Sequence, residues 1–197
     1  VAGSPVAIGI FVGTDTQQER RPPAGFLVAI LAAVVVISDQ FTKQVVRNAF
    51  VHGESRTVIP GFFDLTYIRN SGAAWGMFKD QGVLLIGVSL VMLVLMCFFY
   101  RSLVADAPEH RFAFGLLLGG IIGNLLDRIR LSAVTDFLDF YIGSYHWPAF
   151  NIADSSICIG VFLYLLSTLW VRNHPLHADE RAAEMDRSNS PGESSEP

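Results

Sequence analysis

Long runs of apolar residues, separated by short polar stretches, dominate the pattern along the chain. Four apolar blocks cover about residues 25–46, 83–100, 112–130 and 152–171. Each comes close to the ~20 residues that a helix needs to cross the ~30 Å hydrocarbon core of a bilayer. The third block is rich in glycine, and small residues let helices approach closely in lipid. The pattern therefore predicts an integral membrane protein with four spanning helices.

The stretch between the first two blocks has a different pattern. Residues 57–78 mix prolines and glycines with β-branched and aromatic residues, which favours short strands over a helix. Backbone of this kind cannot face lipid, so we expect it at the membrane surface or outside. The predicted fold class is therefore a mostly α-helical membrane protein with a small β part.

The two ends of the chain are more polar. Arg20 and Arg21 precede the first apolar block like the start of a signal peptide. That block runs into Ser38-Asp39-Gln40 and not into a small-residue cleavage site, so we interpret it as an uncleaved anchor. Residues 1–24 and 172–197 are expected to be disordered tails around one domain, 25–171. An even number of spans puts both tails on one side, and basic residues flank both sides, so they do not decide which.

Composition supports a membrane protein. Hydrophobic residues make up 51% of the chain and charged residues 16%, whereas soluble domains are about one quarter charged. No basic patch with interleaved aromatics is present, which argues against a nucleic-acid partner. Two cysteines are too few for a disulfide framework.

Ionisable residues inside spanning helices are costly and are kept where they are buried in protein and used. Asp39 and Lys43 lie four apart in the first block, so they share a helix face and suit an ion pair, structural or functional. Asn124, Asp127 and Arg128 form one polar face of the third helix. Asp127 beside Arg128 should stay ionised and paired, which indicates a supporting role.

Further polar residues lie just outside the helices or at their ends. Asp136 follows the third block, and Asp139 comes three residues later. Asn151 precedes Asp154 at the start of the fourth helix, where a helix N-cap and a first-turn acid are the structural alternative. Asn70 lies in the β stretch, where a turn is the structural alternative.

Paired carboxylates are the chemistry that these residues fit. Two acids held close share one proton, so that one acts as a base on water and the other as an acid toward a carbonyl oxygen. The sequence has no visible nucleophile–histidine pairing and no HExxH metal motif. The carboxylates are the candidate catalytic groups that remain, and the pattern alone does not show which of them react.

Five stretches in order resemble the bacterial lipoprotein signal peptidases, the signal peptidase II family. They are 39–43 (DQFTK), 70–75 (NSGAAW), 119–128 (GGIIGNLLDR), 134–137 (VTDF) and 150–155 (FNIADS). Together they cover about residues 25–171. Trp75 stands where phenylalanine is commoner in the family, and both tails are longer than the family core needs.

The resemblance implies a membrane aspartic endopeptidase that removes signal peptides from lipid-modified prolipoproteins, cutting just before the diacylglyceryl-cysteine. It implies that Asp136 and Asp154 form the catalytic dyad, and not Asp127 or Asp139. It also implies a group of residues that shape or support the site: Asp39, Lys43, Asn70, Gly72, Asn124, Arg128 and Asn151.

The family resemblance also implies a setting. The expected fold has four spanning helices and an extracytoplasmic β-sheet cradle, with both tails in the cytoplasm and the site near the outer face of the bacterial inner membrane. Neither metal nor cofactor is expected, the partners are prolipoproteins and membrane lipid, the chain is expected to be a monomer, and the cyclic peptide globomycin is expected to block it.

Two other classes remain as alternatives from the residues alone. Acids in spanning helices also serve as proton relays, so a proton-coupled transporter is one rival. A membrane adaptor whose acids are only structural is the other. Four spans are few for a transporter, and the acids gather near one membrane face instead of lining a path across it.

Overall fold

A computed structural model describes residues 24–72, 77–104 and 108–173. The predicted tails lie outside these residues except for Ala24, Arg172 and Asn173, which are helical, and Trp75 of the second resembling motif also lies outside them. The elements are α1 (Ala24–Ala49), β1 (Ser55–Ile59), β2 (Phe63–Asn70), α2 (Gly82–Phe98), α3 (Tyr100–Val104), α4 (Pro108–Leu131), β3 (Val134–Ile142), β4 (Tyr145–His146) and α5 (Ile152–Asn173).

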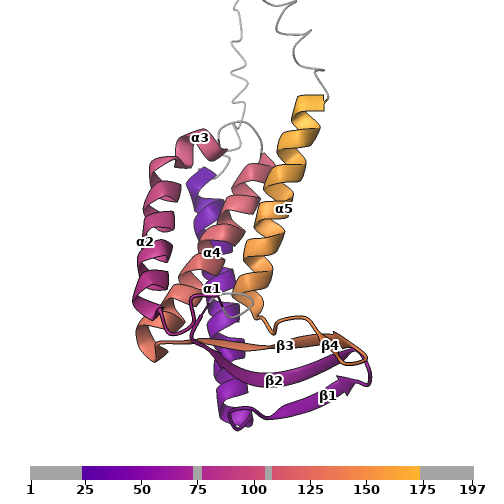
Figure 1. The fold of residues 1–197 in the computed structure, drawn as a ribbon. Helices are drawn as coiled ribbons and strands as arrows, with labels where there is room; N and C mark the ends of the chain where they lie inside the picture. Colours follow the sequence, from indigo (N-terminus) through magenta and orange to yellow (C-terminus); the bar gives the residue numbers. More distant parts are fainter. Residues whose placement is uncertain (1–23, 73–76, 105–107, 174–197) are drawn as a thin grey trace, which may run out of the picture.

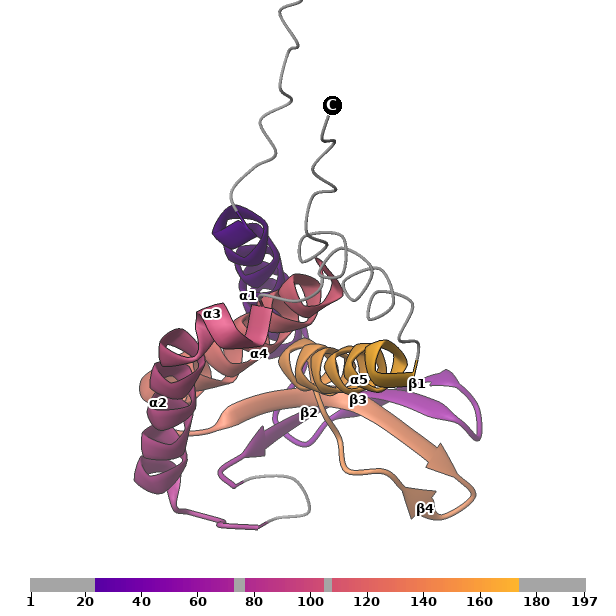
Figure 2. The ribbon, with the colours of Figure 1, turned by 90° about the horizontal axis from the view of Figure 1, so that it is seen from above.

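The long helices lie side by side, and α4 contacts α1, α2 and α5 (Figures 1 and 2). Three of the described helices are long and apolar enough to cross a membrane, within 25–49, 109–131 and 152–170. The fourth, α2, has 17 residues and so a length of roughly 25 Å. These helices coincide with the four predicted blocks, and the predicted fold class is confirmed.

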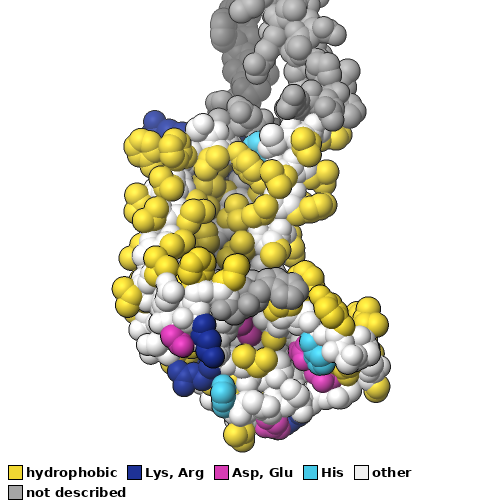
Figure 3. All heavy atoms as spheres, viewed as in Figure 1, with side chains coloured by type: hydrophobic (Ala, Val, Ile, Leu, Met, Phe, Trp, Pro, Cys, Tyr) yellow, Lys and Arg dark blue, Asp and Glu magenta, His cyan; other side chains and the backbone are white. Residues whose placement is uncertain are grey.

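Apolar side chains cover the outside of the helices. Figure 3 shows them as an almost continuous apolar surface over the helical part, whereas charged side chains gather around the sheet. Val83 and Phe98 on α2 are 87% and 79% exposed. Side chains of this kind favour hydrocarbon over water, so the surface of the helices is that of a protein in a bilayer.

Glycines let α4 lie close to both of its long neighbours. A Cβ added at Gly119 would lie 2.6 Å from the Cβ of Val35 on α1, and one at Gly120 would lie 2.5 Å from the carbonyl oxygen of Ala153 on α5. Any larger residue at these positions would push the helices apart. The glycine-rich third block is thus the contact surface of the central helix.

The four strands form one antiparallel sheet in the order β1-β2-β3-β4, at one end of the helices (Figure 1). β1 and β2 confirm the strands predicted between the first two blocks. No element was predicted from the sequence at β3, which carries Asp136. This strand begins three residues after α4 ends, beyond a turn in which Ser132 has φ +56°.

Backbone hydrogen bonds also join β3 to the residue pair that precedes α5. Leu138 N–H donates to the carbonyl oxygen of Phe150 at 2.9 Å, and Phe150 N–H donates to that of Leu138 at 3.1 Å. The residue after Phe150 is Asn151, so this pairing brings the N-terminus of α5 beside β3. Residues that lie far apart in the sequence meet there.

Candidate active site

A buried ion pair on α1 lies at the sheet end of the helices. The Nζ of Lys43 is 2.8 Å from Oδ2 of Asp39, and both side chains are 0% exposed. The predicted pair is confirmed. The other oxygen of Asp39 accepts a hydrogen bond from the backbone N–H of Ala153 at 2.9 Å, which holds the first turn of α5 against α1.

Asp127 joins the same buried cluster. Its Oδ2 lies 3.3 Å from Nζ of Lys43, and its Oδ1 lies 3.7 Å from Nη1 of Arg47. The expectation that Asp127 pairs with Arg128 is wrong. Consecutive residues point about 100° apart around a helix, so the two side chains leave α4 in different directions. Arg128 lines a cavity instead, and its Nη2 donates to the carbonyl oxygen of Gly72 at 3.3 Å.

Asn124 connects this cluster to the start of α5. Its Oδ1 accepts a hydrogen bond from Nζ of Lys43 at 2.9 Å. An amide whose oxygen is occupied by an ammonium group must present its NH₂ on the other side. That NH₂ donates to Oδ1 of Asp154 at 2.7 Å. Lys43 therefore orients Asp154 through Asn124.

Asn151 and Asp154 form the helix cap that the sequence offered as an alternative. The backbone N–H of Asp154 donates to Oδ1 of Asn151 at 2.9 Å, and the N–H of Asn151 donates to Oδ2 of Asp154 at 3.2 Å. This reciprocal pair is a capping box. The cap also has a second role, because Nδ2 of Asn151 donates to Oδ1 of Asp136 at 2.7 Å. Asn151 therefore caps α5 and also binds Asp136.

Asn70 binds the other oxygen of Asp136. Its Nδ2 donates to Oδ2 of Asp136 at 2.9 Å, while its Oδ1 accepts the N–H of Gly72 at 2.9 Å. The turn at Gly72 is tight, since an added Cβ would lie 2.7 Å from the carbonyl oxygen of Met77. The turn expected at Asn70 is therefore present, and it orients the amide toward Asp136.

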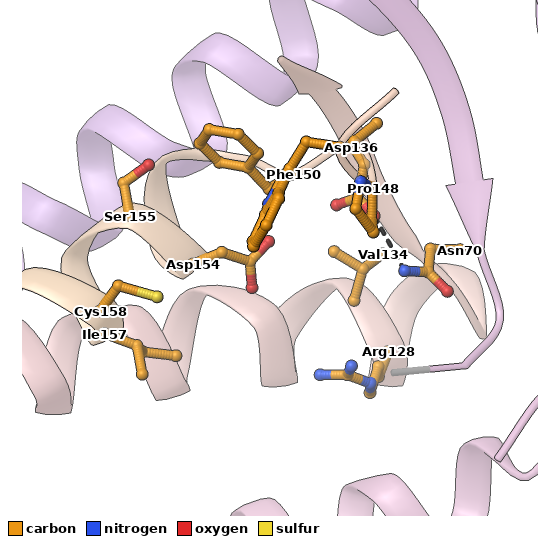
Figure 4. A pocket seen from close by; sticks show the side chains of 12 residues that line it. Asn70, Arg128, Val134, Asp136, Pro148, Phe150, Asp154, Ser155, Ile157 and Cys158 are labelled. Carbon is orange, nitrogen blue, oxygen red and sulfur yellow. Dashed lines mark hydrogen bonds between the residues drawn. The ribbon is translucent and has the colours of Figure 1, made fainter. Parts of the chain in front are cut away.

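Asp136 on β3 and Asp154 on α5 line one cavity of about 400 Å³. Figure 4 shows the two carboxyls on its wall, with the Asn70 amide pointing toward Asp136. Most of the remaining wall is apolar and comes from two stretches, the loop before α5 and the first turns of α5. These residues are Trp147, Pro148, Ala149, Phe150, Ile157 and Cys158.

The pKa of Asp136 is raised from its usual value of 3.8 to about 7. Burial is the largest cause, because removal from water disfavours the charged form, and the charge of Asp154 adds to it. The hydrogen bonds from Asn70 and Asn151 and the charge of Lys43 act in the opposite direction. Asp136 therefore exchanges a proton near neutral pH.

The other acids singled out in the sequence lie elsewhere. Asp139 places both carboxyl oxygens 3.0 Å from Nδ1 of His146 on β4. Asp39 and Asp127 belong to the buried cluster. Within the described residues no three histidine, cysteine, aspartate or glutamate side chains are arranged to hold a metal ion.

Several residues of the buried cluster had no predicted role. Arg47 and Thr135 contact Asp127, and Gln40 donates to it at 3.1 Å. Arg47 lies four residues beyond Lys43, so the i, i+4 spacing that relates Asp39 to Lys43 could have indicated it. No signal pointed to residues 147–149, whose place depends on the pairing of this loop with β3.

Comparison with known proteins identifies a family. The family described as signal peptidase (SPase) II matches residues 31–170. The lipoprotein signal peptidase of Oleidesulfovibrio alaskensis is 44% identical over 150 residues, covering 74% of this chain and 96% of the relative. That of Nitratidesulfovibrio vulgaris is 47% identical over 137 residues, covering 68% and 83%.

The chain belongs to the signal peptidase II family. A solved structure titled as a bacterial membrane enzyme, studied by the in meso method at 2.3 Å resolution, superposes on this family member with a TM-score of 0.68. It shares 35% identity with it, over 75% of this chain and 90% of the other. As a signal peptidase II, the chain is a multi-pass membrane protease. The matched region contains all the polar residues described above, from Asp39 to Asp154.

Proposed function

We propose that this chain removes the signal peptide from lipid-modified prolipoproteins, cutting before the diacylglyceryl-cysteine, with Asp136 and Asp154 as an aspartic dyad. The observation that carries the proposal is that these two carboxyls line one mainly apolar cavity, each held by asparagine side chains. The names of the relatives, lipoprotein signal peptidases, supply the substrate class.

The proposed reaction is a hydrolysis by general acid–base catalysis. In the proposed cycle Asp136 starts with the shared proton, and Asp154, which accepts two N–H donors, acts as the base. Asp154 takes a proton from water as its oxygen attacks the scissile carbonyl carbon, and Asp136 protonates the carbonyl oxygen. The tetrahedral intermediate then returns a proton to Asp136, the C–N bond breaks, and Asp154 protonates the leaving amine.

The cavity suits a substrate that arrives within the bilayer. Its apolar wall from Trp147 to Phe150 and from Ile157 to Cys158 offers a surface for acyl chains. A signal peptide is helical in lipid, and a helical peptide bond is shielded by its own hydrogen bonds. We therefore propose that the segment around the cleaved bond unwinds and lies extended beside the sheet.

Cleavage of a lipid-modified precursor by the purified full chain in detergent tests this function. We expect release of the signal peptide, followed on a gel, from a diacylglyceryl-modified precursor, and little release from the same precursor without lipid, because the acyl chains contribute apolar contacts that the unmodified protein lacks. A chelator should leave the rate unchanged. Equal cleavage of the two precursors would contradict the requirement for lipid.

The pH dependence of cleavage is expected to report the proton on Asp136. As pH rises through about 7, Asp136 ionises and the general acid is lost, so kcat should fall. Loss of the Asn70 hydrogen bond raises the pKa of Asp136 further, so in Asn70→Ala the alkaline fall should move to higher pH. A rate that stays flat to pH 9 would contradict the assignment.

Unfolding does not explain such a fall. Folded Asp136 keeps a proton that the unfolded chain releases near its usual pKa of 3.8. The unfolded state therefore binds fewer protons between pH 3.8 and about 7, and this group lowers the free energy of unfolding over that interval. Above about 7 its contribution is constant, so thermal unfolding measured at each pH separates the two effects.

We also propose that the chain acts as a monomer in the bacterial inner membrane, with the sheet and the cavity at the periplasmic face and both tails in the cytoplasm. Thr57 on β1 and Ser102 on α3 are exposed at opposite ends of the helices (Figure 1). In a variant without the native cysteines, a membrane-impermeant maleimide should label Thr57→Cys in spheroplasts and Ser102→Cys only after lysis. The reverse pattern would overturn this orientation.

A further inference from the structure

Thr135, the residue before Asp136, is held from three sides. Its backbone N–H donates to Oδ2 of Asp127 at 3.1 Å, and its hydroxyl accepts a hydrogen bond from Nη1 of Arg47 at 3.0 Å. Its carbonyl oxygen accepts a longer contact from Nδ2 of Asn151, at 3.4 Å. We call Arg47, Asp127 and Thr135 the Thr135 clamp.

Strand geometry makes this contact important for Asp136. Successive side chains of a strand point to opposite faces, so the side chain of Thr135 points toward α1 while that of Asp136 points toward the cavity. Both residues are almost fully buried, at 1% and 2% exposed. A rotation of the strand at Thr135 therefore moves the carboxyl of Asp136 directly.

Val134, Thr135 and Asp136 pair with β2, but the ladder is interrupted immediately after them. The pairing of β2 with β3 shifts between Ile68, opposite Asp136, and Leu65, opposite Leu138. Two residues of β2 thus oppose one of β3, a bulge that interrupts the ladder right after Asp136. On the other side, the turn from α4 passes through Ser132 at φ +56°, a conformation that serine rarely adopts. A contact outside the ladder therefore helps to define the direction of the strand.

The Thr135 clamp attaches β3 to the two helices that also orient Asp154. Arg47 is on α1, one turn beyond Lys43, and Asp127 is on α4, one turn beyond Asn124. Asp127 also pairs with Lys43, whose ammonium group orients Asn124 and through it Asp154. The clamp and the Lys43–Asn124 contacts therefore hold the carboxyls of Asp136 and Asp154 against the same two helices, α1 and α4.

We propose that Arg47 and Asp127 are positioning residues for Asp136 that act through Thr135, so that the Thr135 clamp sets the geometry of the reaction and not the binding of substrate. This inference rests on the proposed role of Asp136. Arg47 and Asp127 do not line the cavity. A misplacement of about 1 Å in a reacting group can cost about 100-fold in rate, so removal of a clamp contact should lower kcat.

Four variants of the full chain test the proposal in the lipid-modified precursor assay. Thr135→Val removes the hydroxyl and keeps the backbone N–H, and Arg47→Met removes its donor. Each should lower kcat by about tenfold or more with KM within about twofold of wild type. The double variant should be no slower than the slower single one, because both remove the same contact. Thr135→Ser restores the hydroxyl and should recover most of kcat.

Arg56→Met is the matched control. Arg56 also makes side-chain hydrogen bonds, to Glu54 and to the carbonyl oxygen of Ala49, but lies on β1 away from the cavity. It should keep wild-type kcat. If Thr135→Val and Arg47→Met also keep it while Asp136→Asn is inactive, the clamp is not a positioning device. The same conclusion follows if their losses multiply in the double variant, or if Thr135→Ser recovers nothing. Activity in Asp136→Asn would instead remove the proposed dyad on which the inference rests.

Discussion

Replacement of Asp136 or Asp154 by asparagine is expected to abolish signal peptide release. General acid–base catalysis contributes about 10²–10⁴-fold per group, so each variant should lose at least about a hundredfold in kcat. Asparagine keeps the size of the side chain and its capacity to hydrogen-bond with Asn151, but it does not exchange the proton. The measurement is single-turnover cleavage of the lipid-modified precursor in detergent.

Asp139→Asn is the control for these two variants. Asp139 lies on the same strand as Asp136, but its carboxyl contacts His146 and does not line the cavity. This variant should retain near wild-type turnover, and all three proteins should remain folded by circular dichroism. Near-full turnover in either Asp136→Asn or Asp154→Asn would show that the dyad assignment is wrong. A transporter, the rival class, would give no cleavage even in the wild type.

Replacement of Lys43 by methionine is expected to cause the largest loss of stability. Lys43 and Asp39 are 0% exposed, and Lys43 lies within 3.3 Å of a second buried carboxylate, Asp127. Removing one partner of a buried pair leaves a charge without compensation and typically costs about 3–5 kcal/mol. The variant should also lose cleavage activity, since the Asn124 amide is no longer oriented toward Asp154. Thermal unfolding in detergent measures the first effect.

Charge compensation gives a sharper form of this test. In Lys43→Met/Asp39→Asn the buried cluster keeps only the charges of Asp127 and Arg47, which cancel. The double variant should therefore be more stable than Lys43→Met alone. Lys79→Met is the control, because Lys79 is an exposed cation outside the cluster. Equal melting temperatures for Lys43→Met and Lys79→Met would mean that the pairing of Lys43 contributes little to stability.

Local patterns in the sequence predicted a substantial part of this protein. The four apolar blocks became the long helices because a helix in lipid must have an apolar surface along its whole length. The Asp39–Lys43 pair followed from i, i+4 spacing, and the cap formed by Asn151 and Asp154 followed from i, i+3 spacing. Both of these pairs lie within about one helical turn, where chain geometry leaves little choice.

Which aspartates line the cavity depends on the tertiary structure. Spacing could not separate Asp136 from Asp139, since that choice depends on β3, whose alternation and pairing direct one acid to the cavity and the other to His146. Nor could it show that Asp127 turns away from Arg128 toward Lys43, because the neighbour that each side of α4 contacts is set by the packing of α1. The resemblance to a family named the dyad; the residues alone did not.

By itself, the sequence determined the membrane class, the helices, the two strands after α1 and the local polar pairs, because these depend on contacts between residues close along the chain. Only the tertiary structure decided that β3 and the N-terminus of α5 meet, that two asparagines hold Asp136, and that Arg47 reaches Thr135. Contacts between these elements join residues as many as 114 positions apart. They form only when the helices are packed, since a periodic pattern specifies which face of an element is buried and not which partner covers it.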